Sequence, residues 1–393
     1  MAAKKLYFLI FFIILVATVG CGLVQDTGRD AIQSSAAVTP SGNQVDSNAA
    51  NLVTISSPSV APASSTPSQT ASPTSTITPT PTSTKIVFEV GKELTIEYLR
   101  DLEISGSEII FEEKLADRSN YYQYLVSYIS QGNKIYGLLT IPFGDPPEGG
   151  FKAIVFNHGY IPPTTYRTTE RYRPYVDYLA RSGFVVFKID YRGHGQSEGE
   201  PSGSYFSPGY TIDSITALKS LQMMEIIDPQ GIGMWGHSMA GNLVLRAMLI
   251  EPDIQAGVIW AGAVYSYDDF VTYGINDTSY RPPATPESGE GTDRRRQSQI
   301  IFDTYGRPDT QVEFWKAVSL TENIEFLTSP LQIHHAEDDT VVNIAYSFDL
   351  AVVLQQNGKQ YEFYTYEGGG HNLVSPYFDQ AMLRTVEFFR DNL

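Results

Sequence analysis

The amino-acid sequence predicts an α/β domain with a mostly parallel central sheet and helices on both faces, spanning residues 85–393 of the 393-residue chain. From residue 153 to the end, apolar strand-like segments alternate with helix-like segments, which is the pattern of a parallel sheet. Residues 1–84 differ sharply in composition, because an apolar leader precedes a stretch rich in Ser, Thr and Pro. The chain therefore divides into a leader, a linker and one folded domain.

Residues 1–20 have the features of a secretory signal peptide of the lipoprotein type. Two lysines precede an apolar run over residues 6–19, which is shorter than the roughly 20 residues of a membrane span. Thr18-Val19-Gly20-Cys21 resembles the sequence at which bacterial lipoproteins are cleaved and lipidated. The single cysteine, Cys21, is therefore expected to carry a lipid that tethers the protein to the cell membrane, outside the cytoplasm. The alternatives are an incidental thiol in a secreted protein, or an uncleaved anchor.

Residues 21–84 are predicted to be a disordered linker. Ser, Thr, Pro and Ala dominate this segment, which ends in SPTSTITPTPTST. A segment of this composition cannot bury enough apolar surface to compensate for its chain entropy, and its prolines keep it extended. We expect a stalk between a membrane anchor and the folded domain.

Charge and composition limit the classes of partner. The formal net charge is −17 at pH 7, which argues against nucleic acid or an anionic membrane surface as a partner. No H-E-x-x-H pattern or Cys/His cluster indicates a metal site. The oligomeric state cannot be predicted from these features.

Within the domain the predicted strands are short apolar runs, and in the last predicted helix Phe378, Met382, Val386 and Phe389 fall on one face. Strand-like segments at residues 109–111, 124–130 and 134–141 come first, and Gln131-Gly132-Asn133 is expected to form a hairpin turn. The alternating part has predicted strands at residues 153–157, 184–190, 231–235, 256–263, 331–335 and 361–366. Its helices are predicted at residues 166–182, 212–225, 242–250, 344–356 and 378–390. Reactive groups are expected just after the strands, since ligands bind beyond the carboxyl ends of such sheets.

The segment GIGMWGHSMAGN contains a candidate nucleophile, Ser238. Gly236 to Ala240 nearly matches the G-x-S-x-G turn of serine hydrolases, with alanine in place of the last glycine. Such a turn between strand and helix exposes the serine hydroxyl to a base, without which it is a poor nucleophile. The alternative is that Ser238 caps an ordinary helix.

A base and an acid should follow the serine in the chain. His371 lies in Gly-Gly-Gly-His-Asn after a predicted strand, in a loop that can present an imidazole, whereas His334 and His335 end a buried strand. The candidate acid is Asp339, with Asp338 as its rival and Glu337 as a third choice. Its carboxylate would orient the imidazole and stabilise the imidazolium.

An oxyanion hole requires hydrogen-bond donors near the serine. The backbone N–H groups of Tyr160, after the first strand of the alternating part, and of Met239 are the candidates. His158, in the same Asn-His-Gly-Tyr segment, is predicted to brace the loop. A Gly193-x-Gly195 pattern is interpreted as a structural loop, because its glycine spacing does not match that of dinucleotide-binding sites.

Across residues 120–393 the pattern resembles the α/β-hydrolase superfamily, and within it the prolyl-oligopeptidase-like catalytic domains and their dienelactone-hydrolase-like bacterial relatives. The segments that carry the resemblance are NHGY at 157–160, DYRGHG at 190–195, DP at 228–229, GIGMWGHS at 231–238, FWKAVS at 314–319 and HAEDDTVV at 335–342. The resemblance implies a Ser238–Asp339–His371 triad, an acyl-enzyme intermediate and no cofactor or metal.

The expected activity is that of a prolyl-oligopeptidase-like serine peptidase acting on peptides or related amides. The alternative is a carboxylesterase or lipase, and a more remote one is an inactive hydrolase fold that only binds, which the alanine at position 240 favours. Residues 264–329, between two predicted strands, are expected to form a lid. Their aromatic residues would either contact the substrate or pack the lid itself; they include Tyr265, Tyr267, Phe270, Tyr273 and Tyr280.

Overall fold

The structure is a computed structural model that describes residues 88–276 and 290–393, with side chains up to 276 and from 297. The predicted signal peptide, the lipidation site Cys21, the linker and Tyr280 of the predicted lid lie outside the described residues. Among the helices of the described part, none is both long enough and apolar enough to cross a membrane.

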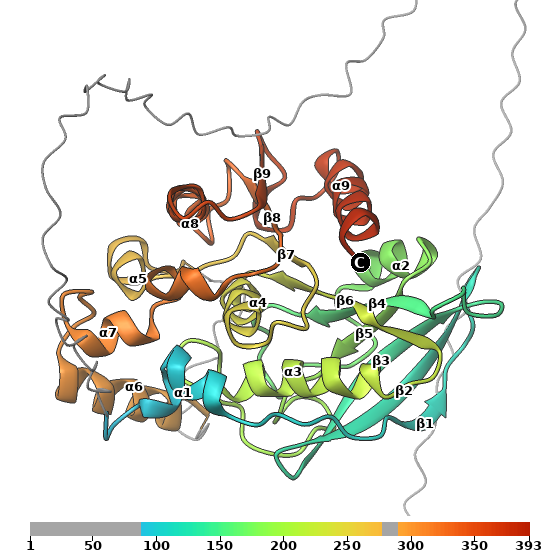
Figure 1. The fold of residues 1–393 in the computed structure, drawn as a ribbon, viewed down its shortest axis with the longest axis horizontal. Helices are drawn as coiled ribbons and strands as arrows, with labels where there is room; N and C mark the ends of the chain where they lie inside the picture. The colour runs from blue at the N-terminus through green and yellow to red at the C-terminus, as the bar shows by residue number, and fades with distance from the viewer. Residues whose placement is uncertain (1–87, 277–289) are drawn as a thin grey trace, which may run out of the picture. The chain divides into compact units, whose positions relative to one another are not determined.

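The described residues form a nine-stranded sheet in the order β1-β2-β3-β5-β4-β6-β7-β8-β9 (Figure 1). The pairs β1-β2, β2-β3 and β3-β5 are antiparallel, and every later pair in this order, from β5-β4 to β8-β9, is parallel. The predicted α/β fold with a mostly parallel sheet is confirmed. The strands are β1 (Ile110–Lys114), β2 (Tyr121–Ser130), β3 (Asn133–Pro142), β4 (Phe151–Asn157), β5 (Val185–Ile189), β6 (Ile227–His237), β7 (Gly257–Trp260), β8 (Leu331–Ala336) and β9 (Tyr361–Tyr366).

The predicted hairpin turn joins β2 and β3. Ser130 pairs with Asn133, so the turn consists of Gln131 and Gly132 alone. Both have positive φ, 47° and 81°, as a two-residue turn needs to match the twist of its strands.

Helices cover both faces of the sheet (Figure 1). One apolar cluster joins the sheet to α1 (Ile96–Asp101), α3 (Gly209–Gln222), α4 (Met239–Ile250) and α8 (Ala345–Gln356). A second cluster, on the opposite face, contains α2 (Arg173–Arg181) and α9 (Tyr377–Asn392). Between β7 and β8 the chain forms α5 (Tyr267–Tyr273), α6 (Glu290–Tyr305) and α7 (Glu313–Val318).

The helix predicted to begin at residue 166 begins only at Arg173. The preceding residue, Tyr172, has φ 60° and ψ 20°, a left-handed conformation that interrupts a helix. Tyr166 donates a hydrogen bond to the buried carboxylate of Asp190 at 2.7 Å, and Thr168 donates another to it. These tertiary contacts hold residues 166–172 as a loop despite their helical sequence pattern.

Several histidines are buried in the domain, and burial lowers the pKa of three of them. The pKa of His237 is lowered to about 3, by burial and by the neighbouring His371. The pKa values of His158 and His334 also lie well below the usual value of 6.5, mainly because of burial. A histidine that is neutral in the fold but takes up a proton when unfolded stabilises the protein above pH 6.5, and this stability is lost as the pH falls from 6.5 toward the folded pKa.

We therefore expect the free energy of unfolding to decrease below pH 6.5, by about 1.4 kcal/mol per pH unit for each such histidine. Asp190 acts in the opposite direction between about pH 6 and 4, because burial raises its pKa to about 6. Urea denaturation of the wild type and of His334→Gln at several pH values between 7 and 5 isolates one histidine. The free energies of unfolding of the two proteins should converge as the pH falls. A constant difference between them would show that the pKa of His334 is not lowered in the folded protein.

Candidate active site

Ser238 lies at the turn between β6 and α4. Its backbone has φ 57° and ψ −120°, a strained conformation for a residue with a side chain. The backbone N–H of Ser238 donates a hydrogen bond to the carbonyl of Trp260 at 2.9 Å, while the side chain makes no capping hydrogen bond to the helix. Ser238 thus occupies the N-cap position of α4 without the side-chain hydrogen bond that an ordinary capping serine makes, which favours the nucleophile prediction.

The structure explains why an alanine is accommodated at position 240. A Cβ atom on Gly236 would lie 2.6 Å from the carbonyl oxygen of Ala240, and a Cβ on Gly241 would lie 2.5 Å from Cα of Gly262. The close approaches of α4 to β6 and to the loop after β7 therefore fall at positions 236 and 241, where the chain has glycine. The methyl group of Ala240 is fully buried in the fold.

The histidine and aspartate predicted to serve Ser238 are in direct contact. Nδ1 of His371 lies 2.8 Å from Oδ2 of Asp339. Asp338 is exposed, and its carboxylate instead accepts a hydrogen bond from the backbone N–H of Gly370 at 2.7 Å. The structure thus pairs His371 with Asp339, and Asp338 braces the glycine loop that carries the histidine.

The carboxylate of Asp339 is fully buried and well supplied with donors. Oδ1 accepts the backbone N–H groups of Val341 and Val342 at 2.8 and 3.0 Å. Oδ2 also lies 3.2 Å from Nε2 of His335, which the sequence analysis had placed only in a buried strand. Burial alone would raise the pKa of Asp339, but the hydrogen bonds from His335 and His371, the charge of His371 and the Val342 N–H hold it well below its usual range. Asp339 is therefore ionised at neutral pH.

Ser238 and His371 line the same cavity, of about 430 Å³. Because Nδ1 of His371 is bonded to Asp339, Nε2 is the ring nitrogen left to accept a proton from a hydroxyl. Ser238 also lines a neighbouring cavity of about 260 Å³ together with Tyr160 and Met239, the residues predicted to supply the oxyanion hole. The N-terminus of α4 begins at Met239, and a helix N-terminus favours negative charge beside it.

Two residues that the sequence analysis did not select link these parts of the site. The hydroxyl of Tyr172 accepts the N–H of Gly159 at 2.9 Å and lies 2.8 Å from Nδ1 of His237. Nε2 of His237 lies 2.8 Å from the carbonyl oxygen of His371. With His237 neutral, Tyr172 donates to Nδ1 and Nε2–H donates to the carbonyl. This chain of bonds joins the loop before Tyr160 to the loop that carries His371.

Replacing Tyr172 with phenylalanine should lower kcat about tenfold, with a smaller effect on KM, because losing a hydrogen bond of about 1.4 kcal/mol loosens the His371 loop. Steady-state kinetics with any substrate that the protein turns over provide the measurement. Tyr178→Phe, which removes a hydroxyl from the adjoining helix α2, is the control. Equal kcat values for the two variants would show that the bond chain does not position His371.

In the described part of residues 264–329, the first aromatic residues are packed inside the domain. Tyr265 and Tyr267 are buried, with the ring of Tyr267 5.2 Å from that of Trp315. In the two cavities beside Ser238, the residues that come from 264–329 are Ile275 and Gln297. These contacts favour the packing alternative for Tyr265 and Tyr267.

The environment of His158 agrees with a structural role. The ring is fully buried, lies 4.5 Å from the ring of Tyr166 in a stacked arrangement, and contacts the carbonyl of Gly159 through Nδ1. Gly193 and Gly195 have positive φ values, 73° and 59°, in a loop after β5.

Two family models match the domain. Residues 151–278 match the model described as serine aminopeptidase, S33, and residues 215–392 match the BAAT / acyl-CoA thioester hydrolase C-terminal model. The first match contains Tyr160, Ser238 and Met239. The second contains Ser238, Asp339 and His371, so every member of the candidate triad lies in a hydrolase-type match.

Curated relatives share the same part of the chain. The human protein ABHD12B is 26% identical over 248 residues, which is 61% of this chain and 60% of the human protein. The uncharacterized peptidase YtmA of Bacillus subtilis is 25% identical over 250 residues, or 63% of this chain and 85% of YtmA. The chain thus spans about three fifths of the human relative's length.

Solved structures share the fold. Acetyl xylan esterase 1 from Thermoanaerobacterium superposes with a TM-score of 0.54 at 16% identity, covering 75% of this chain and 90% of the esterase. Porphyromonas gingivalis dipeptidyl peptidase 4 superposes with a TM-score of 0.52 at 19% identity, covering 70% of this chain and 36% of the peptidase. Together with the strand order and the family matches, these likenesses show that the chain belongs to the α/β-hydrolase superfamily.

Proposed function

We propose that the protein is a serine hydrolase in which Ser238 is the nucleophile, His371 the general base and Asp339 the residue that orients the base. The observation that carries this proposal is the strained turn at Ser238, whose side chain shares a cavity with the imidazole that Asp339 holds at 2.8 Å. The three side chains follow β6, β8 and β9, and in a parallel sheet the carboxyl ends of such strands lie at one edge, where ligands bind.

In the proposed reaction, Nε2 of His371 accepts the proton of the Ser238 hydroxyl as Oγ attacks the substrate carbonyl carbon. The negative charge on the carbonyl oxygen is stabilised by the backbone N–H groups of Tyr160 and Met239, and Asp339 stabilises the imidazolium. The imidazolium then protonates the leaving alcohol or amine, and an acyl group remains on Ser238. Attack by water, deprotonated in turn by His371, releases the acid and restores the serine.

We propose peptides or related amides as the first substrate class. The serine aminopeptidase model and the likeness to the B. subtilis peptidase support this class. Carboxylic esters or thioesters are the second candidate. The acyl-CoA thioester hydrolase model favours them, as does the small cavity beside Ser238, which Phe206, Met239 and Ile275 line with apolar atoms.

Parallel assays on peptide p-nitroanilides and on p-nitrophenyl esters of increasing acyl length separate the two classes. A peptidase should hydrolyse anilides as well as activated esters, whereas an esterase should hydrolyse only the esters. If neither series is turned over by the folded protein, the proposed activity is rejected in favour of an inactive, binding hydrolase fold.

We also propose that the protein is a lipoprotein held outside the cytoplasm through Cys21. The lysines, the apolar run and the Thr18–Cys21 sequence support this proposal. Metabolic labelling of the wild type and of Cys21→Ser with an alkyne-tagged fatty acid in a bacterial host tests it. The wild type should carry the label and be found in the membrane fraction, and Cys21→Ser should not be labelled. A wild type without label would refute lipidation.

A further inference from the structure

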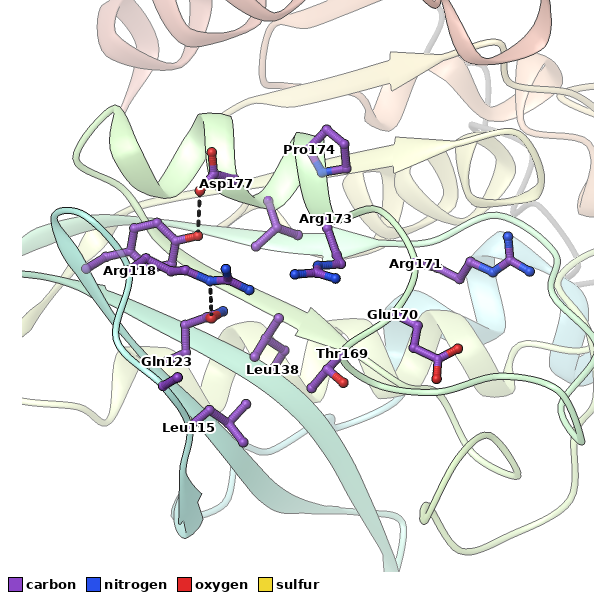
Figure 2. A pocket seen from close by; sticks show the side chains of 13 residues that line it. Leu115, Arg118, Gln123, Leu138, Thr169, Glu170, Arg171, Arg173, Pro174 and Asp177 are labelled. Atoms are coloured by element: carbon purple, nitrogen blue, oxygen red, sulfur yellow. Dashed lines mark hydrogen bonds between the residues drawn. The ribbon is translucent and has the colours of Figure 1, made fainter. Parts of the chain in front are cut away.

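A second cavity, of about 690 Å³, lies between α2 and the strands β2 and β3, outside the site already described (Figure 2). We call it the arginine cavity, because Arg118, Arg171 and Arg173 all line it. Its remaining lining residues are Leu115, Ala116, Tyr121, Gln123, Leu138, Thr169, Glu170, Pro174, Val176 and Asp177.

The charge in the arginine cavity is positive, in a chain whose net charge is −17. Figure 2 shows the guanidinium groups of Arg118 and Arg173 pointing toward one another. In the described part of the chain, no ion pair joins either group to a carboxylate. Asp177 accepts a hydrogen bond from Tyr121 at 2.8 Å and lies 3.7 Å from Arg181, so its charge is already offset. Two like charges that face one another repel, and an anion between them would relieve the repulsion.

Among the lining residues, Glu170 carries a negative charge that would repel a bound anion. Figure 2 shows it projecting from the same loop as Arg171, away from Arg118. Because Asp177 is paired with Arg181, the lining has an excess of positive charge: three arginines and one carboxylate that is unpaired among the described residues, that of Glu170.

The backbone that carries these arginines is held in place by buried contacts. Lys188, buried beneath the loop, lies with its Nζ 3.3 Å from the carbonyl oxygen of Arg171, and Tyr166 is bonded to Asp190 at 2.7 Å. On the other wall, Nε of Arg118 donates to Oε1 of Gln123 at 2.8 Å, which leaves its terminal N–H groups for a ligand. Prior ordering of this kind reduces the entropy lost on binding.

The rest of the lining is partly apolar, which indicates the kind of molecule that would carry the anionic group. The side chains of Leu138 and Val176 are buried under the cavity, and that of Leu115 is half-buried beside them. An inorganic ion would leave this apolar surface uncovered, whereas an organic acid would cover it with its carbon chain. Arg171 lines both the arginine cavity and the cavity that contains Ser238 and His371. The two cavities therefore adjoin at this residue.

We propose that the arginine cavity binds the anionic end of an elongated substrate, a carboxylate on an apolar chain, while the bond to be cleaved lies at Ser238. The carboxylate would be held by Arg118 and Arg173, because guanidinium groups form strong, charge-assisted hydrogen bonds to carboxylates. This inference rests on the proposed function for the position of the cleaved bond, but the binding of the anion can be measured separately.

The test compares p-nitrophenyl esters that end in a free carboxylate with matched esters that end in a methyl ester, over a series of chain lengths. The wild type should prefer the acid-ended ester at one or more chain lengths. Arg118→Gln and Arg173→Gln should each lower kcat/KM for the acid-ended ester about tenfold and leave the neutral ester unchanged. Arg390→Gln, which removes a positive charge from α9 outside the cavity and leaves the Arg181–Asp177 pair intact, should preserve the preference.

Calorimetric titration of Ser238→Ala with the free dicarboxylic acids keeps the inference testable if no ester is hydrolysed. Binding that is lost on adding Arg118→Gln or Arg173→Gln supports the anion site even when the proposed activity fails. Two results would overturn the inference: no binding of the dicarboxylic acids to Ser238→Ala, or equal losses of kcat/KM for acid-ended and neutral esters in the arginine variants. If a free dicarboxylic acid changes the turnover of the neutral ester while acid-ended esters gain no preference, the ligand is an effector and the substrate assignment is overturned.

Discussion

Replacing Ser238 with alanine is expected to lower kcat by about 10⁴ to 10⁶, since the attacking atom is removed and only binding and oxyanion stabilisation remain. The strained turn should survive, because it is imposed by the close contacts of Gly236 and Gly241 and by the Ser238 N–H bond to Trp260. Steady-state kinetics on the best substrate of the ester and anilide series, together with a thermal melt, provide the measurement.

Ser319→Ala is the matched control for this variant. Its hydroxyl is buried without a hydrogen-bond partner in the described structure, and it lines neither cavity beside Ser238. It should keep kcat within about threefold of the wild type, as expected for a residue outside the reacting groups. Full activity in Ser238→Ala would remove this serine from the mechanism.

Asp339→Asn is expected to lower kcat by about 10⁴, because an amide cannot stabilise the imidazolium and favours the wrong tautomer of His371. The carboxylate accepts hydrogen bonds from two backbone N–H groups and contacts two histidines, so the asparagine variant should also melt at a lower temperature. Since its pKa is depressed, Asp339 contributes this stability above the unfolded pKa of about 3.9 and loses it as the pH falls below that value.

Asp338→Asn gives the comparison that separates the two acids. Asp338 is exposed and bonds only the backbone of Gly370 among the contacts described. Its variant should lose less than about tenfold in kcat, the size of one hydrogen bond. A larger loss of kcat in Asp338→Asn than in Asp339→Asn would show that Asp338, and not Asp339, is the acid of the triad.

The sheet and the candidate site could be predicted because their sequence signals are local. Apolar runs mark the strands, and the glycines around Ser238 mark the tight turn whose contacts require the absence of a Cβ atom. The order of serine, acid and base then limited the choice to a few residues. The choice between Asp339 and Asp338 as the acid could not be settled from the sequence, because the direction in which a carboxylate points from a loop depends on tertiary contacts.

Other features depend on groups that meet only in the fold. The late start of α2 follows from contacts between Tyr166 and Asp190, which no helical pattern in residues 166–172 reveals. The Tyr172–His237 link joins a loop to a strand end, and His335 reaches Asp339 from inside β8. The arginine cavity likewise brings together Arg118 and Arg173, which are 55 residues apart in the sequence (173 − 118).

The most direct test of the central claim is a crystal structure of the protein after reaction with a fluorophosphonate. The account predicts a covalent bond from phosphorus to Oγ of Ser238, with Nε2 of His371 within hydrogen-bonding distance of that oxygen. The phosphoryl oxygen should face the backbone N–H groups of Tyr160 and Met239. A phosphonate attached to another residue, or an imidazole of His371 turned away from the adduct, would contradict it.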